Sequence, residues 1–364
     1  MKHDEEFPVP IMCSIPTPSR RARVDRRGSG DAPVVDVHNH ILTPAVEDLI
    51  GRHYSRDEIN AHEPYDLYAG AKSAAHNRSL FPELRPKMTD AGQRIRDMDA
   101  MGVDIQILAT FVSQFYYWTD GELGQRIARL QNERLAELVA DRPDRFVAIG
   151  TVPLQDSTRA VAELEHVMGP LGFKGVQISS SVDGIDLDDP RFVPFFERAE
   201  QLGAVVVIHP NGWDTGRRLD DYYLINVIGN PLDSTVALTR LIFAGRLAQF
   251  PGLKLCVVHG GGYTPFYSAR MDHAWEVRPE CREDIDEPPS TYLRRVHFDT
   301  MVFSARQVGH LVEFAGADHV LLGTDYPFDM GERDPLGLTD RLGVSDADRD
   351  LIRGGNAVRL FDIS

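Results

Sequence analysis

Eight short, β-branched apolar runs alternate along the chain with longer segments of helical periodicity, and this alternation constrains the fold more than any other feature. Segments 121–141, 157–168 and 191–202, which lie between the runs, carry apolar residues at helical spacing and end near Gly or Pro. Nearly continuous apolar runs suit parallel strands that are buried on both faces. Eight such strand–helix units in one chain predict an α/β fold, a closed (β/α)8 TIM barrel. The predicted strands span residues 34–40, 103–110, 146–153, 175–180, 204–210, 254–260, 296–300 and 320–327.

Two stretches fall outside this rhythm. Residues 1–32 are rich in proline, carry a basic run and show no hydrophobic period, so we predict a poorly ordered N-terminal tail, with docking on a partner subunit as the alternative. Residues 33–364 form the predicted barrel. Within it, residues 43–93 are too long for a plain strand-to-helix loop and hold many polar and aromatic side chains, so we predict a lid-like insertion over the barrel mouth. An ordinary surface excursion is the alternative.

Charge and cysteine content limit the partners and the compartment. The chain has 39 Lys and Arg against 55 Asp and Glu, a formal net charge of −16. This balance argues against a nucleic-acid partner, because a phosphate-binding face needs excess basic residues. The three cysteines form no C-x-x-C pair, which fits a reducing compartment. The sequence shows neither the roughly 20 apolar residues of a membrane span nor a secretory apolar region, so we predict a cytoplasmic protein without a membrane partner.

Histidine stands twice at the end of the first predicted strand, as His38 and His40. Side chains two apart on a strand point to the same face, so both are expected to project into the barrel mouth. In this fold the active sites form at that end of the strands. Two imidazoles on one face are natural ligands for a zinc-like ion. On its own, the H-x-H pair fits two hydrogen-bonded core histidines equally well.

Three further predicted strands end in residues of the same kind. The fifth ends with His209 before a proline, the sixth with His259 before three glycines, and the eighth with Asp325 in Gly-Thr-Asp-Tyr-Pro. One apolar strand that finishes in His or Asp is commonplace, but five such residues on four strands, all at the catalytic end, predict a metal site. The glycines 260–262 lack the Lys-Ser/Thr of a phosphate loop and are interpreted as a close approach of the backbone to the site.

The order H-x-H, H-P, H-G-G-G and G-T-D-Y-P-F resembles the amidohydrolase superfamily, and more narrowly its 2-amino-3-carboxymuconate-6-semialdehyde decarboxylase branch. The resemblance runs from about Val34 to Phe361. It is specific for the branch and much less specific for the substrate. Further matching segments are 96–99, 145–153, 175–178, 250–254 and 355–357.

The resemblance implies a set of roles for the five residues. In the family, residues matching His38, His40, His209 and Asp325 hold one divalent ion, usually zinc, and a water completes the coordination sphere. The residue matching His259 acts as a base toward that water. General chemistry agrees, because a divalent ion lowers the pKa of bound water and a neighbouring histidine can move the proton. We therefore expect one divalent ion, Zn²⁺ first and Mn²⁺ as the alternative, with His259 and Asp325 as catalytic groups.

Arginines are the candidates for binding a carboxylate substrate, because their planar fork binds both oxygens. Arg270 matches a family arginine, which implies that it reaches into the neighbouring subunit's site of a homodimer; a helix salt bridge is the alternative. A second family arginine falls near Pro82 here. This departure leaves the exact substrate open, with Arg85 or Arg78 as compensating residues.

Other residues near the strand ends receive simpler interpretations. Trp213 and Phe328 stand where the family often has aromatics, so both are predicted pocket walls, with core packing as the alternative for Phe328. Lys174 begins the fourth strand, the wrong end for the carboxylated lysine of binuclear members, so one metal is expected. Cys256 lies mid-strand and is predicted to be a buried core residue.

The resemblance predicts a nonoxidative decarboxylase of an unsaturated or aromatic carboxylic acid. The H-x-H pair favours a carboxymuconate-semialdehyde-like substrate, because several aromatic-acid branches resemble E-x-H at this point. A hydrolase or hydratase acting on an amide, lactone or carbon–carbon bond is the second hypothesis, since one metal site serves several chemistries. A non-catalytic binding protein is the third, but it would be expected to have lost a ligand or the base.

Overall fold

The computed structural model describes residues 32–63, 67–212 and 217–363, so the predicted tail lies almost wholly outside the described residues. Each of the eight predicted strands contains a shorter parallel strand. These strands are β1 (Val35–Asp36), β2 (Ile105–Leu108), β3 (Phe146–Ala148), β4 (Gly175–Ser179), β7 (Val205–His209), β8 (Lys254–Val257), β9 (His297–Asp299) and β10 (Val320–Leu321). A small antiparallel hairpin, β5 (Ser181–Val182) with β6 (Ile185–Asp186), follows β4.

Backbone hydrogen bonds close the eight strands into a barrel. β1, β2 and β3 form one parallel sheet, and β10, β9, β8, β7 and β4 form a second. A parallel bridge between Gly150 and Val176 joins the two sheets on one side. On the other side Asn39 pairs with Tyr326, and the backbone N–H of Val37 donates to the carbonyl of Leu322 at 3.0 Å. The predicted (β/α)8 architecture is therefore confirmed.

Two apolar layers hold the barrel together, and the strand period of two separates them. In β7, Val205 and Val207 belong to a cluster shared with β1, β2, β8 and β10, whereas Val206 and Ile208 belong to the larger cluster shared with the helices. All four side chains are essentially inaccessible to solvent. Burying one such side chain contributes about 1.5–3 kcal/mol, so the apolar runs visible in the sequence stabilise both layers.

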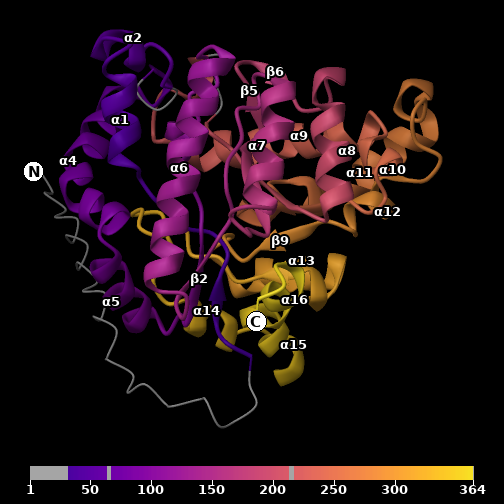
Figure 1. Cartoon of the computed structure of the whole chain (residues 1–364). Coiled ribbons are helices and arrows are strands. Elements are labelled where there is room, and N and C mark those ends of the chain that lie inside the picture. The colour runs from indigo at the N-terminus through magenta and orange to yellow at the C-terminus, as the bar shows by residue number, and fades with distance from the viewer. Residues whose placement is uncertain (1–31, 64–66, 213–216, 364) are drawn as a thin grey trace, which may run out of the picture.

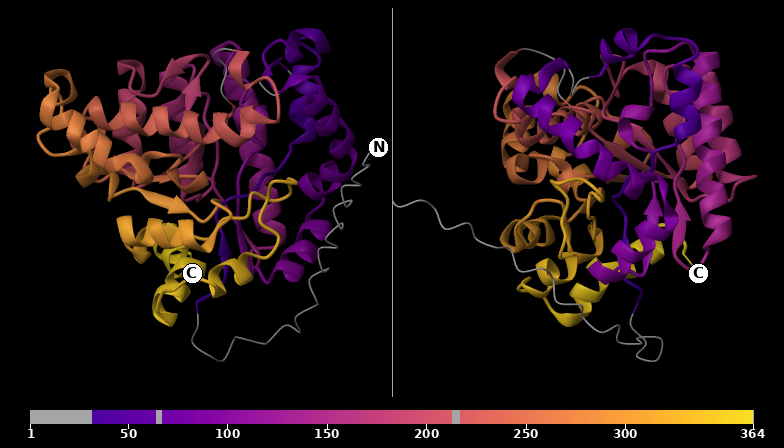
Figure 2. Two further views of the ribbon diagram at one scale, coloured as in Figure 1. Left: turned by 180° about the vertical axis from the view of Figure 1, so that it is seen from behind. Right: turned by 90° about the vertical axis from the view of Figure 1, so that its left-hand side faces the viewer.

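Helices surround the strands, and α6 (Gly121–Asp141), α7 (Ser157–Met168) and α8 (Val193–Leu202) pack in succession on one side of the barrel (Figures 1 and 2). Asp120 caps α6 by accepting hydrogen bonds from the backbone N–H groups of Glu122 and Leu123. No described helix is long and apolar enough to cross a membrane. The main helices after the insertion are α5 (Ala91–Met101), α6 (Gly121–Asp141), α7 (Ser157–Met168), α8 (Val193–Leu202), α9 (Asn230–Phe243), α10 (Arg246–Gln249), α11 (Thr264–Val277), α12 (Pro289–Leu293), α13 (Ala305–Ala315), α14 (Pro335–Asp340), α15 (Asp346–Asp350) and α16 (Asn356–Leu360).

The insertion between the first two strands is helical where it is described. It contains α1 (Pro44–Ile50), α2 (Arg56–Asn60) and α4 (Gly70–Thr89). α1 buries Leu49 and Ile50 against Leu123 and Ile127 of α6. His76 of α4 contacts the loop that follows Asp325, because its Nε2 lies 3.6 Å from Oδ2 of Asp329 in that loop. The insertion thus contacts both the outer helices and a loop at the catalytic end.

Candidate metal centre

Four of the five predicted residues converge at the carboxyl ends of the strands. His209 is the last residue of β7, and His38, His259 and Asp325 lie shortly after β1, β8 and β10. One nitrogen or oxygen atom from each of these four residues lies within 4.8 Å of the others. The fifth, His40, joins them through Asp325, whose Oδ1 lies 3.0 Å from His40 Nε2. The structure therefore brings together all five residues that the sequence singled out.

Neighbouring strands, not the regular ladder of β1, position His38 and His40. The β1 ladder ends at Asp36, and the chain beyond it is bonded to the segment after β10. The N–H of Asp325 donates to the carbonyl of His38 at 2.8 Å, and the N–H of His40 donates to the carbonyl of Tyr326 at 2.9 Å. These two bonds place the histidines beside Asp325.

Two residues of the centre have left-handed backbone conformations. The φ angle is 53° at His259 and 55° at Asp325. A non-glycine residue in this backbone conformation costs on the order of 1–3 kcal/mol of free energy, and the conformation persists only where the surrounding structure enforces it. His259 opens the short η5 turn (His259–Gly261), in which Gly260 and Gly261 also have positive φ. The three glycines after His259, all with positive φ, thus make the sharp turn that re-aims the chain.

Hydrogen bonds fix which ring nitrogens are free to bind a cation. His209 Nδ1 lies 2.6 Å from the carbonyl of Pro210, which can only accept, so Nδ1 carries the proton and Nε2 carries a lone pair. His38 Nδ1 lies 2.6 Å from Asp299 Oδ2, and its Nε2 faces Asp325 Oδ1 at 3.4 Å. The Nε2 atoms of both rings are buried and have no hydrogen-bond partner among the described residues. Such a pattern is typical of metal-binding histidines held by outer hydrogen bonds.

The electrostatics of the centre favour a cation. Burial opposes protonation of His38, but the charge of Asp325 and the hydrogen bond to Asp299 outweigh it and raise the pKa of His38 to about 10. Burial lowers the pKa of His40, and burial together with the neighbouring imidazoles lowers that of His209 well below its usual value. Two buried carboxylates thus attract positive charge, which a divalent ion would supply in place of the proton on His38. The neutral imidazoles of His40 and His209 offer lone pairs. This donor set fits one divalent ion of the zinc or manganese type.

Asp299, which the sequence-based reasoning did not single out, supports the centre from the end of β9. Its side chain is completely buried. One oxygen accepts from His38 Nδ1, and the other accepts from the backbone N–H groups of Gly260 at 2.8 Å and Met301 at 3.2 Å. Asp299 therefore ties the orientation of His38 to the turn that carries His259. Its place at the end of a strand, like the other site residues, is the signal that could have revealed it.

A buried polar network lies behind the first strand. Asp36 accepts from the N–H of His38, from both the N–H and the hydroxyl of Thr324, and from Gln106 Nε2, at 2.7–3.0 Å. Burial raises the pKa of Asp36 to about 6 in spite of these bonds. Gln106 Oε1 in turn accepts from Arg94 Nη1 at 3.0 Å. The network connects the two segments that carry His38 and Asp325.

Arg94 is the cationic end of this network and is 1 % exposed. It donates to Asn39 Oδ1 at 3.0 Å and to the backbone carbonyl of His40, and it lies 4.8 Å from the ring centroid of Tyr326. Burial lowers the pKa of Arg94 to about 10, so the side chain stays charged at neutral pH. The sequence carries one signal for it: Arg94 is four residues before the buried Met98, on the same face of α5.

The predicted substrate-binding residues lie in different places. The ring of Phe328 is 5.0 Å from that of His40, centroid to centroid, so Phe328 borders the centre. Arg85 instead forms a two-bond pair with Glu47 of α1 at 2.7 and 3.0 Å. Arg270 is exposed on α11, and within the described part of the chain it has no ion pair. Trp213 lies outside the described residues.

Lys174 and Cys256, for which the sequence predicts no catalytic role, lie where expected. Lys174 Nζ pairs with Asp362 Oδ2 at 2.9 Å near the end of the chain. Lys174 directly precedes β4, so it lies at the opposite end of that strand from the metal centre. Cys256 is completely buried in β8.

Comparison with known proteins agrees with this geometry. A family model described as Amidohydrolase matches residues 35–363. The 2-amino-3-carboxymuconate-6-semialdehyde decarboxylase of Dictyostelium discoideum is 33% identical over 343 residues, covering 90% of this chain and 91% of that protein. The crystal structure of 5-carboxyvanillate decarboxylase from Sphingomonas paucimobilis has 25% identity and a TM-score of 0.80, and the match covers 92% of this chain and 100% of that one. A dihydroxybenzoic acid decarboxylase from Polaromonas sp. JS666, solved with bound manganese and the inhibitor 2-nitroresorcinol, has 24% identity and a TM-score of 0.76 over 91% of this chain and 97% of that one.

Proposed function

Because this chain belongs to the amidohydrolase family, in its decarboxylase branch, we propose that it is a metal-dependent nonoxidative decarboxylase of an unsaturated or aromatic carboxylic acid. The observation that carries the proposal is the convergence of four histidines on Asp325. Nε2 of His38 and Nε2 of His209 are buried there without a hydrogen-bond partner among the described residues. The extent of the similarity to the Dictyostelium discoideum enzyme favours a carboxymuconate-semialdehyde-like substrate. The few cysteines favour a cytoplasmic location.

In this proposal His38, His40, His209 and Asp325 hold one divalent ion, Zn²⁺ first and Mn²⁺ as the alternative. When bound, the ion supplies a Lewis acid that polarises a substrate oxygen and lowers the pKa of water. Loss of CO2 breaks a carbon–carbon bond and leaves its electron pair on the carbon, which must then gain a proton. His259 stands 3.6 Å from Asp325, Nε2 to Oδ2, and moves that proton. Phe328 forms one wall of the pocket, and α4, beside the loop after Asp325, acts as a lid.

The substrate carboxylate needs a cation, and we propose that Arg270 supplies it across a homodimer interface. Arg270 is exposed on α11 and lacks an ion pair within the described residues. The same helix exposes large apolar side chains: Phe266 is 38%, Tyr267 61% and Val277 57% exposed. Phe266 and Tyr267 are adjacent at the start of the helix, and a contiguous exposed apolar patch favours an interaction surface. A second copy of the chain that covers them would bring Arg270 close to a partner.

Release of CO2 tests the decarboxylase proposal directly. We expect the metal-loaded protein to release CO2 from at least one acid of a panel containing freshly generated 2-amino-3-carboxymuconate-6-semialdehyde, 2,6-dihydroxybenzoate and 5-carboxyvanillate. Removing the ion with a chelator should lower the rate by at least about 100-fold, because the ion contributes several kcal/mol, and adding Zn²⁺ or Mn²⁺ back should restore it. Incorporation of ¹⁸O from water into a product without CO2 would contradict decarboxylation and establish the hydrolase or hydratase hypothesis instead.

Complementation between two inactive variants tests the role of Arg270. Arg270→Ala and His259→Asn are each expected to be inactive, but coexpressed in equal amounts they should regain about a quarter of wild-type activity, because half of the dimers are mixed and each mixed dimer has one complete site. If Arg270 acts within its own subunit, the mixed dimers remain inactive. A different affinity tag on each variant, used in two successive purifications, shows whether mixed dimers formed. Sedimentation analysis shows whether the protein is dimeric, and a monomeric protein would contradict the proposal outright.

A further inference from the structure

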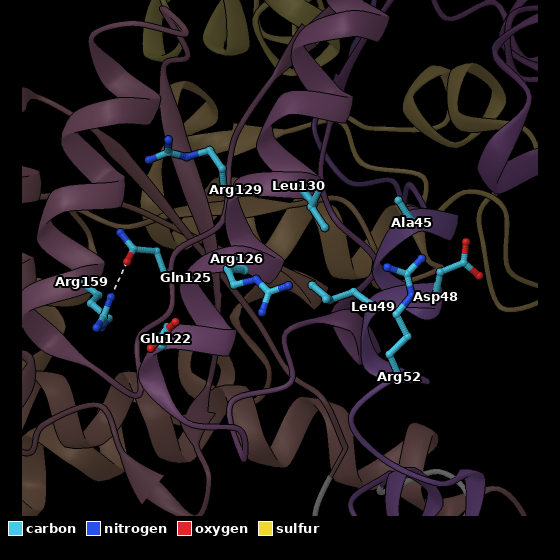
Figure 3. A pocket seen from close by; sticks show the side chains of 10 residues that line it. All are labelled: Ala45, Asp48, Leu49, Arg52, Glu122, Gln125, Arg126, Arg129, Leu130 and Arg159. Carbon is cyan, nitrogen blue, oxygen red and sulfur yellow. Dashed lines mark hydrogen bonds between the residues drawn. The ribbon is translucent and has the colours of Figure 1, made fainter.

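A groove of about 730 Å³ is lined by residues of α1, α6 and α7 and by Arg52 just after α1 (Figure 3). Four of its lining residues are arginines: Arg52 just after α1, Arg126 and Arg129 on α6, and Arg159 on α7. On a chain with a formal net charge of −16, four guanidinium groups around one groove are an unusual concentration. None of the residues that line it belongs to the metal centre or to the network behind it.

Two of the four arginines are held in place by carboxylates. Arg129 donates through Nε and Nη2 to Glu163, whose side chain is completely buried, at 2.7–3.1 Å. Arg159 pairs with Asp156 at 3.1 Å and donates to Gln125. Within the described part of the chain, Arg129 Nη1 and Arg159 Nη2 make no recorded hydrogen bond. These two groups are therefore oriented in advance and retain donors for a ligand.

The other two arginines are unpaired. Arg52 and Arg126 are exposed, and neither has a hydrogen bond or an ion pair from its side chain among the described residues. Two carboxylates also line the groove, Asp48 and Glu122, and neither lies within 4 Å of an arginine of the described chain. Arg52 and Arg126 therefore have donors available that no internal acid satisfies.

Apolar side chains lie between the unpaired arginines. Figure 3 shows Leu49 between Arg126 and Arg52, with Leu130 beside them. Arginine forks bind carboxylate and phosphate groups through two parallel bonds, and the leucines offer contact to a short hydrocarbon segment. The complementary ligand is thus a small molecule with an anionic group at each end and an apolar middle.

We propose that this groove binds a small organic dianion, separately from the metal centre. A dianion that spans Arg52 and Arg126 would join the end of α1 to α6. Hydrogen bonds connect α6 to Thr43, the residue before α1. Gln131 of α6 donates to the backbone carbonyl of Gln114 at 2.8 Å. The side chain of Gln114 donates to the carbonyl of Thr43 at 3.1 Å and accepts from the N–H of Thr43 at 2.8 Å. Thr43 is three residues after His40. Occupancy of the groove therefore stabilises the segment that leads out of the metal centre.

Calorimetric titration of the metal-loaded protein with succinate, and separately with inorganic phosphate, tests the site. Sodium chloride holds the ionic strength constant. We expect succinate to bind with Kd of about 1 mM or tighter, to raise the thermal midpoint and to bind more tightly than inorganic phosphate, because it has an anionic group at each end of an apolar segment. Binding of inorganic phosphate alone would overturn the organic dianion.

Matched variants separate this groove from the metal centre. The double variant R52Q/R126Q removes two unpaired charges and should weaken binding at least about tenfold, while R52K/R126K should retain part of it. R306Q/R341Q, which removes two exposed arginines elsewhere, should bind like wild type. Equal binding by R52Q/R126Q and wild type would place the anion elsewhere and overturn the proposal, as would no binding of either anion at about 10 mM. Neither readout depends on decarboxylation, so this proposal and the proposed function fail independently.

Discussion

Replacing His259 with asparagine is expected to lower kcat for CO2 release by roughly 10²- to 10⁴-fold, the usual contribution of a positioned acid–base group, while the protein keeps one divalent ion per chain. Asparagine preserves the polarity of the position but cannot carry a proton between pH 5 and 8. His259 follows β8 in a left-handed conformation and faces Asp325 at 3.6 Å. Its loss should therefore remove a proton carrier without emptying the site.

The matched variant His40→Asn tests whether His40 or His259 is the third histidine ligand of the ion, beside His38 and His209. The four residues whose ligand atoms lie within 4.8 Å of one another include His259 and not His40, although His40 Nε2 is 3.0 Å from Asp325 Oδ1. If His40 is a ligand, His40→Asn loses both the ion and the activity, whereas His259→Asn loses only the activity. Metal content and kcat measured on both variants give the answer. Loss of the ion in His259→Asn, together with its retention in His40→Asn, would exchange the proposed roles.

Replacing Arg94 with methionine is expected to lower the free energy of unfolding by about 3–5 kcal/mol, the range for breaking a buried charged network by removing one partner. Methionine has a similar length but cannot donate to Asn39, Gln106 or the carbonyl of His40. The buried acceptors would be left without a donor, and the segment that carries His40 would lose its anchor. Metal affinity should fall along with stability.

Arg96→Met is the matched control, because Arg96 is exposed two residues along the same helix and bonds only to Gln93 among the described residues. It should change stability by no more than about 0.5 kcal/mol. Urea unfolding of both variants, with and without added divalent ion, measures the difference. A loss below about 1 kcal/mol in Arg94→Met would show that the network is not the anchor of the first strand.

The candidate site could be predicted from the sequence to the extent that its residues end apolar strands. His209 stands directly after a run of buried aliphatic residues and Asp325 three residues after one, so the pattern that predicts the strands also locates the two site residues. Asp299 ends its strand in the same way, yet a lone acid after a short strand carried no motif. Arg94 showed only helical spacing with Met98, which alone does not distinguish a buried arginine from a salt-bridged surface one.

The sequence by itself determined the closed barrel, the end of the barrel that carries the chemistry and the identity of five converging residues, because strand periodicity and strand ends are local properties of the chain. The tertiary structure decided what depends on contacts between distant segments. Arg85 pairs with Glu47, Asp299 orients His38 from β9, and the backbone after β10 places both histidines of the first strand. Four arginines, from α6, α7 and the turn after α1, line one groove. The physical reason is that a hydrogen bond or an ion pair forms between groups that folding brings within about 3 Å, and separation along the chain does not specify that distance.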